Sequence, residues 1–154
     1  MAAPNAADIE RALWSLQAYD TTALATTSDA GPRVVGAFFV PERTGDGIRM
    51  VTAQLRDSHP LHDMALDPRV AFICSPGSPA RWIQGTGVAT VVVDESAHAD
   101  LYERLVAHAP GARAYVERLS VVPAIITVRT LTVVDAVDKP PLRLSLDLGD
   151  LTTL

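Results

Sequence analysis

Closely spaced β-prone segments constrain the fold of this chain more than any other feature. Thr22 to Thr27, Arg33 to Val40 and Gly47 to Ala53 favour strands. Between them stand only the turn residues Asp29 to Pro32 and the polar turn Pro41 to Asp46. Connections this short join antiparallel neighbours, because a parallel pair needs a crossover of about a dozen residues or more. The first part of the chain therefore predicts an antiparallel meander.

Three further strands are expected in the second half of the chain. They are Arg69 to Ser75, then Arg81 to Asp94, and finally Ala124 to Val137. Gly85 and Gly87 interrupt the middle one, and glycines inside a strand often mark the bulge or bend that barrel closure requires. Six strands that mostly follow one another without crossover helices predict a mainly β fold, a six-stranded antiparallel barrel with flanking helices.

Helical segments surround these strands. Ala6 to Tyr19 carries apolar residues at helical spacing, with Asn5 as a candidate N-cap. Ser58 is a candidate cap for a short helix that ends by Asp67 and Pro68. Two helical pieces, Glu95 to Ala107 and Ala112 to Leu119, precede the last strand. Their histidines, His98 and His108, are expected at the surface.

We expect one domain over residues 1–154, since 154 residues with 48% hydrophobic content suffice for a single core. It comprises an N-terminal helix in 1–20, a barrel with helical insertions in 21–138, and an extended tail in 139–154. Leucines alternate at 142, 144, 146 and 148 in that tail, which indicates an extended segment packed on the body or on a partner.

Composition excludes several classes of function. A net charge of -5 without a cluster of basic residues argues against nucleic-acid binding. No apolar run is long enough to span a membrane, and the start of the chain lacks a signal core, so an intracellular, cytoplasmic protein is expected. Cys74 lies in an apolar run and is expected to be a buried thiol. Lys139 is the only lysine beside twelve arginines, so a bound phosphate would rely mostly on arginine, histidine, hydroxyls or backbone amides.

The order of these segments resembles the pyridoxamine 5'-phosphate oxidase-like family of FMN-binding split β-barrels, over roughly Leu13 to Val137. The most specific part lies between Ser58 and Val70. The segments that carry the resemblance are Ala23 to Thr27, Asp29 to Pro32, Val51 and Thr52, Asp57 to Leu61, Asp67 to Val70, and Ile83 to Gly87.

This resemblance implies a homodimer that holds FMN in clefts between its subunits and acts as a flavin-dependent oxidoreductase on a small-molecule substrate. No side chain is an obvious general acid or base, so the catalytic residues stay unassigned. The resemblance implies three groups of cofactor-binding residues. The wall beside the flavin ring comprises Val35, Gly36, Ala37, Phe38, Val51 and Thr52, and the phosphate end comprises Arg56, Ser58 and His59. Trp82 and Gln84 form the third group, which such proteins often supply from the other subunit.

The phosphate end departs from the family pattern. A Ser-Arg-Lys-like triplet is replaced by Ser58, His59 and Pro60. Arg56 and the amides of a helix start can supply part of the missing charge. His59 and His62 also resemble a metal-binding pair, but without a defined third ligand a solvated helix start is the preferred interpretation. Two alternatives stay open: a deazaflavin-dependent reductase, or a non-catalytic protein that binds haem or another cofactor.

Overall fold

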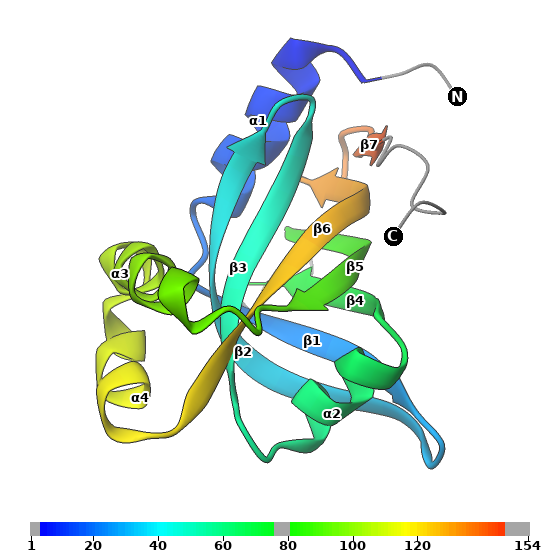
Figure 1. Ribbon diagram of the computed structural model, residues 1–154. Helices are drawn as coiled ribbons and strands as arrows, with labels where there is room; N and C mark the ends of the chain where they lie inside the picture. The colour runs from blue at the N-terminus through cyan, green and yellow to red at the C-terminus, as the bar shows by residue number, and fades with distance from the viewer. Residues whose placement is uncertain (1–3, 76–80, 147–154) are drawn as a thin grey trace.

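The computed structural model describes residues 4–75 and 81–146. The chain folds around one twisted antiparallel sheet, in which the described residues form seven strands in the order β3-β2-β1-β4-β5-β6-β7 (Figure 1). Pairing of β3 with β6 closes the sheet into a barrel. The strands are β1 (Thr21–Ser28), β2 (Gly31–Thr44), β3 (Gly47–Leu55), β4 (Arg69–Cys74), β5 (Trp82–Val91), β6 (Val121–Val134) and β7 (Leu142–Ser145).

The long strand β6 is the point at which the barrel splits. Its first half lies between β5 and β3, and the β3 pairs run from Leu55 with Val121 to Arg49 with Thr127. Its second half lies between β5 and β7, because Thr130 to Val133 pair with the tail strand. The mainly β split barrel expected from the sequence is therefore confirmed.

The number of strands was underestimated. The sequence predicted six strands and an extended tail, whereas part of that tail forms the seventh strand, β7. The leucine alternation has a physical cause, since Leu144 and Leu146 are buried in the main core. Residues 147–154, which include Leu148, lie outside the described residues.

The predicted turn Pro41 to Asp46 was too long. β2 continues to Thr44, and the reversal occupies only Gly45 and Asp46, with Gly45 at φ 52°. Pro41 is accommodated because this end of β2 has left β1 and pairs only with β3. A proline is tolerated where a strand has a free edge.

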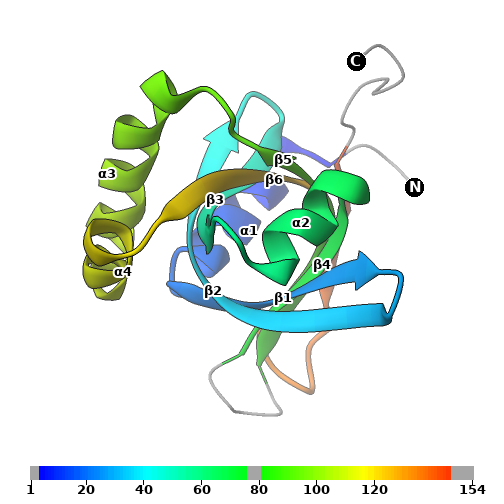
Figure 2. The same ribbon diagram turned by 60° about the horizontal axis from the view of Figure 1, so that its bottom comes forward.

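Helices close the two mouths of the barrel. α1 (Ala6–Leu16) begins at Asn5, whose side chain accepts from the Asp8 amide at 2.8 Å, so the predicted cap is confirmed. Figure 2 shows α2 (His59–Leu66) in front of the barrel and α1 behind it. Among the described residues no helix combines the length and apolar character needed to span a membrane.

The helical insertion between β5 and β6 covers one side of the sheet. It contains α3 (His98–His108) and α4 (Arg113–Arg118), preceded by the short 3-10 turns η1 (Glu95–Ala97) and η2 (Pro110–Ala112). Leu101 and Leu105 of α3 pack against Val51 and Val121 in a core cluster separate from the barrel interior. Each such buried leucine stabilises the fold by about 1.5–3 kcal/mol relative to an exposed one.

The glycines of β5 permit a bulge, as the sequence predicted. The register of β5 and β6 shifts between Thr86 and Gly87, so that Thr86 pairs with Thr130 and Gly87 with Val128. A Cβ at Gly87 would lie 2.7 Å from both Ile126 Cγ2 and the Thr127 carbonyl oxygen. Only glycine fits where the two backbones approach this closely.

Candidate functional site

The start of α2 borders an open depression of about 460 Å³. Ser58 has an extended backbone and caps the helix, since its Oγ accepts from the Leu61 amide at 3.4 Å. The predicted N-cap is therefore confirmed, and Pro60 lies in the first turn, where a missing N–H costs no helix hydrogen bond. The lining residues are Arg56, Asp57, Ser58, His59, Leu61, His62, Ala65 and Val91.

Several donors in this depression can hold an anion. Arg56 is exposed, and its Nε donates to Ser120 Oγ at 3.2 Å, which anchors the guanidinium beside the helix start. His59 is exposed, and the first amide of a helix has no intrahelical acceptor. Since Ser58 Oγ acts only as an acceptor toward Leu61, its hydroxyl proton stays available. The exposed carboxylate of Asp57 opposes these donors.

The predicted ring wall is only partly accessible. Gly36 is exposed on β2, whereas Val51 and Thr52 on β3 are 0% and 1% exposed. Thr52 Oγ1 donates to the Phe38 carbonyl at 2.8 Å, and α3 packs over Val51. The side chains of Val51 and Thr52 therefore contact protein rather than an open cleft.

The other three wall residues differ in what they contact. Ala37 is buried in the barrel interior, and Val35 is partly buried against the same core. Phe38 is half-buried on the side of the insertion, with its ring 6.4 Å from that of Tyr115. The accessible part of the wall is consequently the stretch around Gly36.

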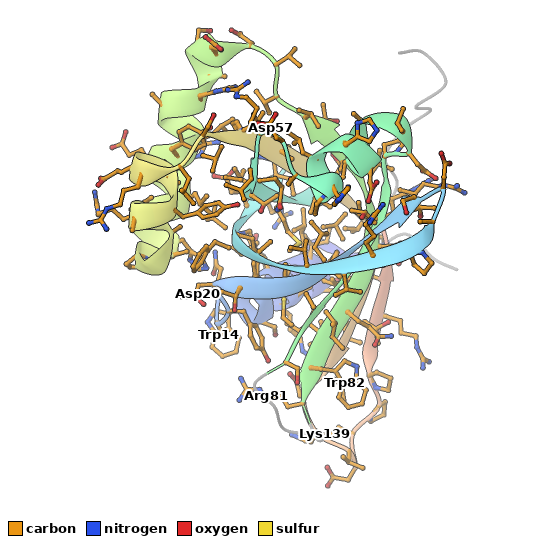
Figure 3. All side chains as sticks on the ribbon, turned by 90° about the horizontal axis from the view of Figure 1, so that it is seen from below. Trp14, Asp20, Asp57, Arg81, Trp82 and Lys139 are labelled. Atoms are coloured by element: carbon orange, nitrogen blue, oxygen red, sulfur yellow. The ribbon has the colours of Figure 1, made fainter. Side chains whose placement is uncertain are left out.

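Trp82 and Gln84 are separate from the residues at the start of α2. Both belong to β5, where Trp82 is half-buried and Gln84 is exposed. In Figure 3, Trp82 and Asp57, the neighbour of Ser58, lie on opposite sides of the molecule. One chain therefore does not bring all the predicted residues together, because they divide into two separate groups.

An apolar surface lies on the outside of the sheet, and sequence reasoning missed it. We call it the outer apolar face. Val34 is 71% exposed and Ile73 is 41% exposed there, over a depression of about 380 Å³ bordered by Gln84. Contiguous exposed apolar surface is typical of interaction sites. The signal in the sequence is the small apolar residues at alternate positions of neighbouring strands. The outer apolar face comprises Ala23, Ala25, Val34, Ala71 and Ile73.

A buried carboxylate was also missed. Asp63 of α2 is 3% exposed and accepts a hydrogen bond from Thr26 Oγ1 at 3.0 Å. Arg33 Nε on β2 lies 3.1 Å from the same Asp63 oxygen. This contact engages the charge of Arg33. Asp63 thereby connects α2 to the hairpin of β1 and β2.

Cys74 and the histidine pair on α2 can also be assigned a role. Cys74 is buried as predicted, and this burial raises the pKa of its thiol to about 11. His59 and His62 belong to no group of three metal-ligating side chains among the described residues. The cysteine is thus an unreactive part of the core.

Comparisons with known proteins bear on the fold. No family model matches the sequence, and no curated protein does. Solved structures do match. General stress protein 26 from Bacillus anthracis has a TM-score of 0.63 and 18% identity over 90% of this chain and 97% of that one. A Clostridium acetobutylicum protein related to general stress protein 26, of the pyridoxinephosphate oxidase family, has a TM-score of 0.69 and 8% identity over 94% and 98%.

The chain has the pyridoxamine 5'-phosphate oxidase-like split-barrel fold. A heme binding protein from Mycobacterium smegmatis has the same fold, with a TM-score of 0.64 and 16% identity over 94% of this chain and 60% of that one. Identities this low establish the split barrel alone, so the ligand has to be argued from the residues of this chain.

Proposed function

We propose that this split barrel binds FMN and works as a flavin-dependent oxidoreductase on a small-molecule substrate. The observation that carries the proposal is the donor set at the start of α2. Arg56, the Ser58 hydroxyl and His59 line one depression with the helix start, and such a set suits a phosphate. Asp57 adds a negative charge, and Pro60 supplies no cation where the family pattern has a lysine, so we expect moderate rather than tight binding.

The functional unit we propose is a homodimer. Trp82 lies on the side of the molecule opposite Asp57 (Figure 3), and Gln84 lines a depression that shares no residue with the one at the α2 start. The outer apolar face borders Gln84, and a second copy packed on it would bury Val34 and Ile73. A two-fold arrangement of this kind lets one chain supply the phosphate end and its partner the Trp82 and Gln84 end.

Bound FMN would supply the hydride or electron transfer, as flavins do. The chain would contribute binding and orientation. Arg56 and Ser58 would hold the phosphate, and the backbone around Gly36 would lie beside the ring. Gln84 of the second copy has an amide that can donate to or accept from a ring edge.

Titration of FMN fluorescence tests this proposal. We expect the protein to quench the flavin, and Arg56→Ala and Ser58→Ala each to weaken binding about tenfold, as loss of a charge-assisted hydrogen bond does. Arg113→Ala is the matched control, because Arg113 pairs with Glu117 on α4 and lines a different surface. Failure to quench FMN, or equal affinities in all four proteins, would refute the assignment.

Haem binding is a second candidate. It is supported by two exposed imidazoles, His59 and His62, in the α2 depression, since imidazole is a common axial ligand of haem iron. The absorption spectrum separates the candidates, because haem, flavin and deazaflavin have different bands. A Soret band that is lost in a His59→Ala, His62→Ala double variant would favour haem.

A further inference from the structure

The bulge in β6 turns one arginine outward. Val128 and Leu131 are both buried in the barrel core, whereas the two residues between them, Arg129 and Thr130, are both exposed. A regular strand would place one of those two inside. The register assigns Thr130 a partner on β5 and leaves Arg129 as the extra residue.

Two features of the fold hold this bulge in place. The Arg129 carbonyl, which β5 cannot pair, accepts from the Leu146 amide at 2.7 Å. Gly87 lets β5 approach β6 directly beside the bulge. Leu146 and Gly87 thus stabilise the bulge that places the Arg129 side chain on the outside of the barrel. Bulges that redirect side chains in this way are common next to functional sites.

The Arg129 guanidinium has no acceptor among the described residues, and it lines a depression of about 510 Å³. Arg69 lies in the same depression and is fixed by Asp67, which it contacts at 2.7 and 2.9 Å. Arg69 holds the pKa of that carboxyl at about 2, so the pair stays ionised and oriented.

Hydroxyls add neutral donors to this depression. Thr86 Oγ1 lies 2.7 Å from Thr130 Oγ1, and one of these two hydroxyls keeps a proton that the pair does not use. Thr27 also lines the depression, and so do Ala25 and Ala71, which belong to the outer apolar face. A cationic end therefore adjoins an apolar floor on a chain whose net charge is -5.

We propose that Arg129, with Thr86 and Arg69, binds the phosphate or carboxylate group of a small molecule whose apolar part lies against Ala25 and Ala71. The site shares no lining residue with the α2 depression. It shares Ala25, Ala71 and Thr86 with the depression on the outer apolar face, so in the proposed homodimer the bound molecule would lie at the edge of the subunit interface. An arginine fork with neighbouring hydroxyls recognises both oxyanions.

Amide NMR titrations on the full chain test the proposal, with inorganic phosphate, phenyl phosphate and benzoate as probes. We expect saturable shifts at Thr27, Thr86 and Arg69, with phenyl phosphate binding more tightly than inorganic phosphate because of the apolar floor. The ranking of benzoate against phenyl phosphate identifies the preferred oxyanion. Arg129→Gln should weaken binding about tenfold.

Arg143→Gln is the matched control. Arg143 is an exposed arginine on β7 outside the depression, so the same change of charge there should leave affinity within about twofold. The proposal is overturned by absence of saturable binding, by equal effects of the two variants, or by shifts confined to the α2 start. It is also overturned if Arg129→Gln weakens only self-association, which would assign the guanidinium to a carboxylate of a second copy.

Discussion

The Asp63 carboxylate on α2 lies 3.1 Å from Nε of Arg33 on β2. Asp63 is almost fully buried, whereas the Arg33 side chain is 36% exposed, so the carboxylate depends on its partners for solvation. Because the candidate phosphate end lies at the start of α2, this contact fixes the position of both the helix and the binding site.

Asp63→Asn should lower the free energy of unfolding by about 2–3 kcal/mol, since it removes the negative charge beside Arg33 and the charged acceptor of Thr26. Urea unfolding followed by circular dichroism measures this loss. Asp57→Asn, a change of the same chemistry at an exposed position, should stay within about 0.5 kcal/mol. Equal losses in both variants would contradict a role for the Asp63 contacts.

Gly87→Ala should destabilise the barrel by about 2 kcal/mol or more, because the new Cβ would meet the Thr127 carbonyl oxygen, which backbone pairing holds in place. Gly36→Ala is the control in another strand, since nothing lies within 4 Å of a Cβ there. Thermal unfolding of the two variants should give clearly separated midpoints. Similar midpoints would show that β5 and β6 can move apart at the bulge.

Cys74 should make stability fall in alkaline solution. Burial raises the pKa of the thiol from 9.0 to about 11, so the unfolded chain loses this proton first as pH rises. The contribution of the protonated thiol is complete below pH 9 and is lost between about pH 9 and 11, which amounts to roughly 2–3 kcal/mol. Cys74→Ala should flatten the decline of urea stability across this window. If the decline of stability is unchanged in this variant, titratable groups other than Cys74 cause it.

Val34→Arg should disrupt the proposed homodimer. Packing a second copy on the outer apolar face would bury the new charge without a partner, which should raise the dimer dissociation constant by about a hundredfold or more. Sedimentation velocity at micromolar concentration measures the change. Val93→Arg is the control, because Val93 is 86% exposed and does not line that face. A monomeric parent protein would refute the dimer itself.

The sequence predicted most of the fold, because its signals were local. The caps at Asn5 and Ser58 and the strand glycines act within a few positions, and the structure confirms them. The seventh strand was missed because Leu142 to Ser145 becomes a strand only through pairing with β6. That pairing depends on tertiary structure rather than on local preference.

The site was harder to predict for the same reason. Asp63 and Arg33 are distant in sequence, and nothing in α2 alone marks Asp63 as buried. His98 and His108 were expected at the surface, and the structure shows them only partly exposed. Both are half-buried and bond to the carbonyl oxygens of Val92 and Tyr19 at 2.7 Å. Each error concerns a polar side chain whose partner comes from another element.

Closure of the barrel by β6 also matters during synthesis on the ribosome. β3 emerges early, but Leu55 to Arg49 find their partners only when Val121 to Thr127 have left the exit tunnel. Until then β3 and β5 each carry an open edge beside uncovered apolar residues, and such edges pair readily with other chains. The nascent chain is therefore most exposed to aggregation just before its last long strand arrives, and a pause in translation ahead of residue 121 would prolong that risk.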